Sequence, residues 1–383
     1  MYGRAVFAHI TRRVYMEINK LISEIIKATE PLPVIRKDWR IGCVGAGAII
    51  NNCHLVAYSD LGFKVSAITS KERDISFDVA KTHNIPKVYD SWQEMLLDES
   101  LEIIDIAVPP HVQLDIVREA VKQPNIKGIL CQKPVAMSLA DAREIARLGV
   151  EHGVKTAINS NMRYDQSMRA LKYILDLGLL GEIIIGTIEM RAIPHWQEFL
   201  KEYDMLELFS MGIHHIDIFR YLFGDPESIT ALCRTDPRSK FPHLDGITQY
   251  TYKYSDDMMA TCLDDVWAWP NEPCEKDMYI KWRVEGLDGM ATGTIGWPAH
   301  PIREPSTMRF TCKSYPNKWL EPSWDTVWFP DAFRGTMSGL LYAIENDTEP
   351  DISAVDNIVT IACVEACYKS IKEERTIKLA DIL

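Results

Sequence analysis

The sequence lacks an uninterrupted apolar run that could span a bilayer, and it has no secretory leader with a small-residue cleavage site. It also lacks a Cys-x-x-Cys pair, and its nine scattered cysteines favour reduced thiols over a disulfide framework or a zinc site. Basic residues are outnumbered 42 to 54, and a net charge of −12 argues against nucleic acid or an anionic membrane as partner. We therefore expect a cytoplasmic protein without a metal site.

The first 36 residues form an extension that differs from the rest of the chain. Apolar residues recur there at helical spacing, from Val14 to Ile26, which predicts an amphipathic helix. Glu17, Glu24 and Glu30 argue against a targeting presequence. We expect this helix to pack on the body of the protein or on another subunit, and to end at Pro31-Leu32-Pro33.

Residues 37–158 alternate short apolar runs with amphipathic stretches. Units of this length predict a doubly wound parallel sheet of the Rossmann type, with helices on both faces. The predicted strands are Ile41–Val44, Val65–Ile68, Ile103–Val108, Gly128–Cys131 and Lys155–Asn159. The predicted helices are Ser76–His83, Gln113–Lys122 and Leu139–Glu151. Ligand is expected at the carboxyl ends of these strands.

Residues 159–383 have a different pattern, which predicts a second α/β domain with a large, open, mainly antiparallel sheet. Runs rich in β-branched and aromatic residues indicate its strands: Glu182–Arg191, Gly246–Tyr254, Met278–Glu285 and Met308–Thr311. Helices are predicted at Gln166–Leu177, Ile213–Phe223 and Ala354–Glu373. The last of them is long enough to pack back on the first domain. We interpret Trp267–Asp277 as a long functional loop.

The turn after the first strand has the composition of a dinucleotide-binding loop. Gly45 permits a tight turn, and Gly47 lets the backbone approach a pyrophosphate. Backbone N–H groups at Ala48 and Ile49 open the following helix and would face the anion. The third glycine of the pattern is missing, because Ile50 occupies that place.

The end of the second strand bears on which dinucleotide is bound. Ser70 offers a hydroxyl, and Lys71 and Arg73 offer cations that suit the 2′-phosphate of NADP. Glu72 could instead supply the carboxylate that bonds the ribose hydroxyls of NAD. We expect NAD, with NADP left open.

Two further groups of residues carry potential chemistry. Lys133, between Gln132 and Pro134 at the end of a strand, would face the ligand crevice, where a lowered pKa would let it relay a proton. On the predicted helix Ile213–Phe223, His214 and Asp217 lie one turn apart on one face. The adjacent His215 points about 100° away, so the two histidines rarely share one ion.

Together these motifs resemble the Gfo/Idh/MocA oxidoreductases, the family of glucose–fructose oxidoreductase and inositol dehydrogenase. The resemblance covers about residues 38–380 and rests on the order of five motifs. They are the G-x-G loop, Val108-Pro109-Pro110-His111, the Gln132-Lys133-Pro134 variant of a Glu-Lys-Pro motif, Asn161-Met162-Arg163-Tyr164, and Gly212-x-His214-x-x-Asp217 with Gly224 closing its helix.

The resemblance implies NAD(P)-dependent oxidation or reduction of a sugar-like hydroxyl, and a homo-oligomer formed through the open sheet. It implies that Lys133 is the catalytic lysine and that His214 is the general acid/base. The residues that it places at the cofactor are Pro109, Pro110, His111, Gln132 and Asn161. Arg163 is a candidate substrate contact.

The chain departs from the family pattern at one position. The family commonly has an Asp four residues before the histidine, where this chain has Ser210, and a hydroxyl cannot stabilise an imidazolium by charge. Glu207, seven residues before His214, lies on the same face if the segment is helical and is the candidate substitute. Ser210 and Asp217 are the other candidate supports.

The substrate is expected to be a sugar, a glycoside or an inositol. Aromatic side chains can stack on the apolar faces of sugar rings, and the candidates are Trp267, Trp269 and Trp196, with His195 beside the last. Two alternatives stay open. One is an enzyme that recycles tightly bound NAD while cleaving a glycoside, and the other is a non-catalytic dinucleotide-binding protein.

Overall fold

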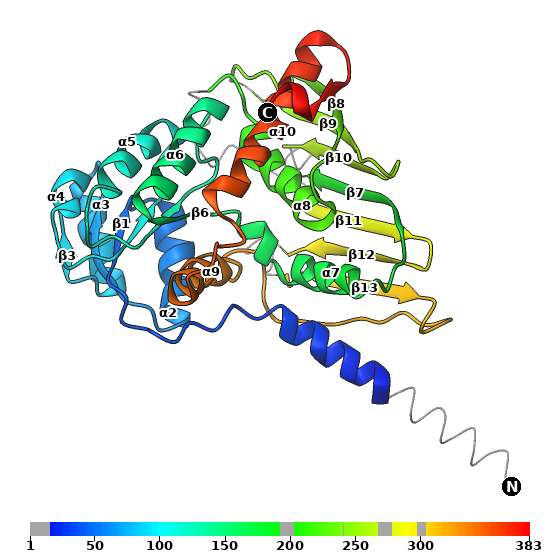
Figure 1. Cartoon of the computed structure of the whole chain (residues 1–383), viewed down its shortest axis with the longest axis horizontal. Coiled ribbons are helices and arrows are strands. Elements are labelled where there is room, and N and C mark those ends of the chain that lie inside the picture. Colours follow the sequence, from blue (N-terminus) through cyan, green and yellow to red (C-terminus); the bar gives the residue numbers. More distant parts are fainter. Residues whose placement is uncertain (1–15, 192–202, 240, 267–277, 297–303) are drawn as a thin grey trace, which may run out of the picture.

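Two β-sheets, one from each half of the chain, organise the protein (Figure 1). The structure is a computed structural model, and it describes residues 16–191, 203–239, 241–266, 278–296 and 304–383. The predicted segments His195, Trp196 and Trp267–Asp277 lie outside the described residues. None of the helices in the described part of the chain is both long and apolar enough to cross a membrane.

The first sheet is the predicted doubly wound parallel sheet. Its strand order is β3-β2-β1-β4-β5-β6, and every pair is parallel. The order reverses between β1 and β4, which creates the crevice where such sheets bind ligands. The strands are β1 Ile41–Val44, β2 Val65–Thr69, β3 Lys87–Val88, β4 Ile103–Ile106, β5 Gly128–Cys131 and β6 Lys155–Ile158.

Helices cover this sheet and are specified by local signals. Ser138 caps α6 by accepting a hydrogen bond from the Asp141 backbone N–H at 3.1 Å, and Gly153 ends that helix in the left-handed region. The helix after β1 contains a π-helical segment, η1, before its α-helical part. The elements are η1 Ile50–His54, α2 Leu55–Asp60, α3 Arg73–His83, α4 Trp92–Leu96, α5 Pro110–Ala120 and α6 Leu139–His152.

The second sheet is large and open, as predicted. Its order is β13-β12-β11-β7-β10-β9-β8-β14, and all pairs are antiparallel except β10 with β7. The strands are β7 Ile183–Arg191, β8 Ser228–Arg234, β9 Ile247–Lys253, β10 Met259–Asp265, β11 Tyr279–Gly286, β12 Gly289–Ile295, β13 Thr307–Cys312 and β14 Ile377–Lys378.

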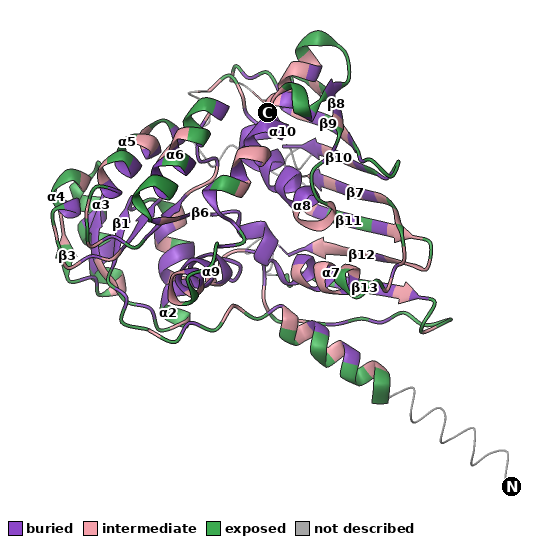
Figure 2. Cartoon of the chain, in the orientation of Figure 1, coloured by how far each residue is buried: buried purple, intermediate pink, exposed green. Residues whose placement is uncertain are grey.

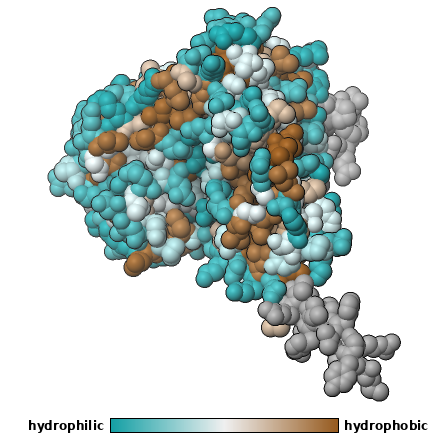
Figure 3. Space-filling view, turned by 45° about the vertical axis from the view of Figure 1, so that its right-hand side comes forward, coloured by the Kyte–Doolittle hydropathy of each residue, from teal (hydrophilic) through white to brown (hydrophobic). Residues whose placement is uncertain are grey.

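Within the described residues, helices cover one face of the second sheet, and Figure 2 shows most of α8 and much of its neighbouring strands as buried. The helices are α7 Gln166–Asp176 and α8 Ile213–Phe223, the latter preceded by the π-helical segment η4 Leu208–Gly212. Figure 3, turned by 45° so that the right-hand side of Figure 1 comes forward, shows apolar patches among polar side chains. Leu232 and Met259 are exposed on this sheet. A homo-oligomer through this face stays a prediction.

Two C-terminal helices return to the first domain. The helix α9, Phe333–Asn346, packs against β5, β6 and α2. The helix α10, Ala354–Glu373, packs against α6 as well as α8 and β8. The first domain is therefore braced by elements from the end of the chain.

The N-terminal extension is helical over residues 16–28, and this helix packs on the body through Leu21 and Ile25. The chain that follows is tied to α9, because the backbone N–H groups of Ile35 and Arg36 donate to the Glu345 carboxylate at 2.9 and 2.8 Å.

A buried cluster of charges, which we call the junction clamp, ties the segment that follows the first sheet to α8 and α10. It consists of Arg163, Asp217, Arg220 and Asp356. Arg163 donates to both oxygens of Asp217, at 2.6 and 2.7 Å, and to Asp356 at 2.7 Å. Arg220 donates to Asp356 at 2.9 Å. Since Arg163 follows the last strand of the first sheet and Asp217 lies on α8, the clamp fixes where α8 sits.

We predict that Asp217→Asn lowers the free energy of unfolding by about 3–5 kcal/mol, because it leaves the buried Arg163 guanidinium without its bidentate partner. Chemical denaturation would measure the change. The control is Asp176→Asn, which removes an exposed i,i+4 partner of Lys172 and should cost about 0.5 kcal/mol or less. Equal losses in the two variants would contradict the clamp.

Candidate active site

The carboxyl ends of β1, β4, β5 and β6 bring the predicted residues of the first domain to one edge of the parallel sheet. The glycine loop follows β1, Pro109 and Pro110 follow β4, and Gln132 with Lys133 follows β5. Asn161 follows β6. Elements η4 and α8 carry the residues that the second domain contributes.

The glycine loop has the shape that a dinucleotide requires. Gly45 has φ of +115°, and a Cβ there would lie 2.4 Å from the Ala107 carbonyl oxygen. A Cβ on Gly47 would meet nothing within 4 Å, so this position borders open space that a phosphate can use. Ala48 is exposed, and Ile49 is half-buried at the start of the helix. The loop therefore fits the group for which it was predicted.

The residues after β2 are partly engaged with one another. The Ser70 hydroxyl donates to the Glu72 carbonyl at 2.8 Å and lies 2.7 Å from the Ser76 hydroxyl. Arg73 pairs with Asp90, whereas Lys71 is exposed. Of the two predicted cations, Arg73 is thus already paired.

The loop after β4 links the two domains. Pro110 occupies the first turn of α5, a position where no backbone N–H is required. His111 is exposed, and its Nδ1 lies 2.9 Å from the Tyr203 hydroxyl of the second domain. This contact places His111 at the border of the crevice.

Lys133 joins the two halves of the site. Its side chain is partly exposed, but its ammonium donates to the Ser210 backbone carbonyl at 2.5 Å. Burial lowers the pKa of Lys133 to about 8, against the opposing effect of the Glu207 charge. The amine form is therefore accessible near neutral pH. The role of Ser210 in this contact is carried by its backbone, not by its hydroxyl.

His214 lies close enough to Lys133 for their charges to interact. Burial, followed by the charges of Lys133 and His215, holds the pKa of His214 well below its usual value. Its ring packs edge-on against Trp328 at 5.0 Å between centroids. Its buried Nε2 has no hydrogen-bond partner among the described residues. His214 is thus a neutral imidazole that can accept a proton.

Trp328 is a site residue that the sequence did not single out. Its indole N–H donates to the Asn161 side-chain oxygen at 2.8 Å, while its ring packs on His214. Asn161 is itself buried and donates to the Asn159 carbonyl at 3.3 Å. Trp328 lies outside any motif of the chain, and no local signal distinguished it from the other tryptophans.

Glu207 does not contact His214 in the way its spacing suggested. Its carboxyl accepts from the Thr248 hydroxyl at 2.6 Å and is hydrogen-bonded to Asp264. Burial and the nearby Asp264 raise the pKa of Glu207 well above its usual value. A protonated carboxyl cannot stabilise an imidazolium by charge. That Glu207 supplies the missing carboxylate stays a prediction, which its burial and its hydrogen bond with Thr248 do not favour.

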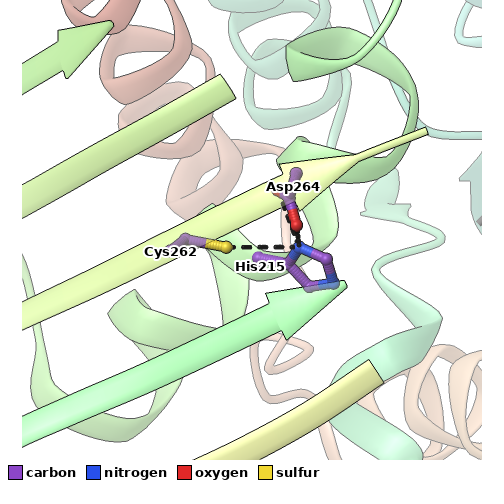
Figure 4. A group of neighbouring side chains, drawn as sticks. All are labelled: His215, Cys262 and Asp264. Carbon is purple, nitrogen blue, oxygen red and sulfur yellow. Dashed lines mark hydrogen bonds and ion pairs between the residues drawn. The ribbon is translucent and has the colours of Figure 1, made fainter. Parts of the chain in front are cut away.

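Beside Glu207 lies a buried group formed by His215, Cys262 and Asp264 (Figure 4). Their ligand-type atoms lie within 4.8 Å of one another, a spacing that a metal could also use. His215 Nδ1 is 3.0 Å from an Asp264 oxygen and 3.6 Å from the Cys262 sulfur. The first distance is that of an ordinary hydrogen bond, so hydrogen bonding accounts for the close approach of these side chains.

Two predicted site residues belong to the scaffold. Arg163 is buried, and its guanidinium is occupied by Asp217, Asp356 and the Asp351 backbone carbonyl. Asp217 accepts from Arg163 and from the Thr360 hydroxyl at 3.0 Å. That Arg163 contacts substrate and that Asp217 supports His214 stay predictions, and both side chains are engaged in the junction clamp.

Two family models match successive parts of the chain. A family model described as "Oxidoreductase family, NAD-binding Rossmann fold" matches residues 39–160, and one described as "GFO/IDH/MocA C-terminal domain" matches residues 168–292. D-apiose dehydrogenase from Paraburkholderia graminis is 25% identical over 364 residues, which cover 94% of each chain.

Solved structures share the fold over nearly the whole chain. An oxidoreductase from Agrobacterium radiobacter, in complex with NAD⁺, L-tartaric acid and magnesium, has a TM-score of 0.77 at 22% identity, covering 90% of this chain and 100% of that one. Levoglucosan dehydrogenase, in complex with NADH and L-sorbose, has a TM-score of 0.75 at 14% identity, again covering 90% and 100%.

Replacing each glycine of the loop by alanine should have a different effect, one on stability and the other on binding. Gly45→Ala should destabilise the protein by about 1–3 kcal/mol, because the new Cβ collides with Ala107 in a backbone conformation unsuited to alanine. Gly47→Ala should leave the unfolding transition in place and weaken dinucleotide binding, because its Cβ enters the space open to the phosphates. Thermal unfolding and nucleotide titration would separate the two. Unchanged affinity in Gly47→Ala would remove the loop from the binding site.

Proposed function

The chain belongs to the Gfo/Idh/MocA oxidoreductases, and we propose that it oxidises a secondary hydroxyl of a sugar, glycoside or inositol by hydride transfer to a nicotinamide cofactor. The observation that carries the proposal is the meeting of Lys133, at the end of a Rossmann strand, with Ser210 and His214 of the second domain. Two groups that can hold or accept a proton thus border the crevice where the cofactor would bind.

The residues of the site divide the work between binding and proton transfer. When bound, the nicotinamide would supply the hydride acceptor. The glycine loop would hold the pyrophosphate, with Pro109, Pro110 and Gln132 toward the nicotinamide. Lys133 as the free amine, or His214 as the neutral imidazole, can take the hydroxyl proton as the carbon–hydrogen bond breaks. Holding the alcohol between Lys133 and His214 would provide much of the rate enhancement.

The relatives support the substrate class and the cofactor. A relative matched over 94% of each chain is named for a sugar, D-apiose, and the family model of the first domain is described as NAD-binding. We propose NAD as the cofactor. Lys71 is the exposed cation that a 2′-phosphate could meet, so the ratio of turnover with NAD and NADP would test this choice.

We predict that kcat/KM for alcohol oxidation rises with pH through about 8, because only the deprotonated amine of Lys133 can accept the hydroxyl proton. Carbonyl reduction needs the ammonium as proton donor, so its rate should fall over the same range. Lys133→Met should lose about 10²–10⁴-fold in turnover and lose the pH dependence. The exposed Lys64→Met variant should keep both. A pH profile that survives Lys133→Met would assign the proton transfer to His214.

The function itself is tested by incubating the purified protein with NAD or NADP and a panel of sugars, glycosides and inositols. We expect the reduced-nicotinamide absorbance to grow with one class of substrate. Glycoside cleavage by a protein that retains its cofactor, without net reduction, would favour the recycling alternative. Absence of both cofactor binding and turnover would overturn the proposal and leave a protein that shares only the fold.

A further inference from the structure

A buried histidine–aspartate pair lies inside the first domain, behind the proposed site. His54 is the last residue of η1, and Asp105 lies within β4, between isoleucines that belong to the sheet core. Both side chains are almost fully buried, and His54 Nδ1 is 2.7 Å from an Asp105 oxygen. The Tyr58 hydroxyl donates to the same oxygen at 2.7 Å. Burying a carboxylate in the middle of a parallel sheet is unfavourable, and the hydrogen bonds from His54 and Tyr58 offset this cost.

The other nitrogen of the His54 ring faces the proposed active site. His54 Nε2 lies 3.3 Å from the side-chain nitrogen of Gln132 and 2.9 Å from that of Asn159. The Gln132 side-chain oxygen accepts the Lys133 backbone N–H at 2.9 Å, which identifies the amide nitrogen as the group that points at His54. An amide nitrogen donates, so His54 Nε2 must be the acceptor.

This chain of donors fixes the protonation of the His54 ring. If Nε2 accepts, the proton of a neutral imidazole resides on Nδ1, where the Asp105 carboxylate receives it. Asp105 thus selects the tautomer, and the tautomer selects the orientation of the Gln132 amide. That amide in turn holds the backbone of Lys133, whose side chain reaches Ser210. The Gln132 main chain is held from another side, because Gln113 donates to its carbonyl at 3.0 Å.

We propose that His54 and Asp105 are positioning residues for Lys133, acting through Gln132. The inference rests on the proposed function for the role of Lys133, but its structural part, the tautomer of His54, does not. Neither residue touches the reacting atoms. Their effect is to hold Lys133 in the geometry in which proton transfer is efficient, as partners behind a functional group commonly do.

The pairing also explains why position 132 is a glutamine. A carboxylate there could only accept, and it would face the lone pair of His54 Nε2 at hydrogen-bond distance. A carboxylate would fit the opposite tautomer, with the proton on Nε2. Asp105 and Gln132 therefore both require the same tautomer of the His54 ring. Changing either residue alone should lower kcat.

The test is a crossed pair of substitutions. Asp105→Asn permits the tautomer with the proton on Nε2, and we expect a roughly tenfold to hundredfold loss in kcat with little change in the KM for cofactor. Gln132→Glu alone should also lower kcat. The double variant should recover most of the loss of Asp105→Asn, because the proton on Nε2 now meets an acceptor. Asn159 can follow by turning its amide over, since its buried Oδ1 has no partner among the described residues.

A merely structural role for the pair predicts that Asp105→Asn lowers the free energy of unfolding and leaves kcat of the folded protein unchanged, so an unchanged kcat in that variant would overturn the proposal. His152→Leu, which removes an exposed histidine at the end of α6, serves as the control and should leave kcat unchanged. The free energy of unfolding is measured for the same three variants, and the double variant should recover stability as well.

The tautomer can be measured on the wild-type protein without any substrate. The ¹⁵N chemical shifts of His54 should show a neutral ring protonated on Nδ1. A proton on Nε2, or a doubly protonated ring, would overturn the proposal even if the enzyme is active. Conversely, a protein that turns over no sugar, but shows the Nδ1 tautomer and recovery of stability in the double variant, would fail only the proposed function.

Discussion

The hydrogen bond from the Lys133 ammonium to the Ser210 carbonyl is the contact on which the geometry of the site depends. It runs from the carboxyl edge of the parallel sheet to the π-helical segment that precedes α8. Because the Lys133 ammonium is desolvated, this bond is worth more than an exposed one, and its loss would leave the ammonium without this acceptor. The position of α8 therefore matters as much as that of β5, and the junction clamp sets it.

Two π-helical segments flank this contact, and each carries a residue that faces the site. The segment η1 ends at His54 directly after the glycine loop, and η4 contains Ser210 just before His214. The wider turn of such a segment changes which way the next side chains point, and such segments occur frequently at functional sites. Here they aim a ring nitrogen at Gln132 and a backbone carbonyl at Lys133. Helices of ordinary pitch in these places would present different faces.

Local sequence signals predicted the fold. The glycine loop, Lys133 and His214 are proposed as site residues because each lies at a strand end or a helix start that its neighbours specify, and their roles stay predictions. The pairing of Arg163 with Asp217 was not predicted, because it joins residues distant in the chain and no local pattern reveals it. The helix α9 was missed because Gly335 and Gly339 weaken its signal. A Cβ on Gly335 would lie 2.3 Å from the Tyr164 ring, so packing requires the glycine that propensity disfavours.

The protonation states of Lys133, His214 and Glu207 depend on one another. Burial lowers the pKa of both Lys133 and His214, and the charge of Lys133 lowers that of His214 further, so the two are not protonated together near neutral pH. Glu207 counteracts this only in part, because its own proton is retained through burial beside Asp264. The missing family carboxylate at position 210 fits this arrangement, since a charge there would pull a proton onto His214. With Ser210 contributing only its carbonyl, the proton stays on Lys133 in the resting site, and the imidazole remains free to accept one.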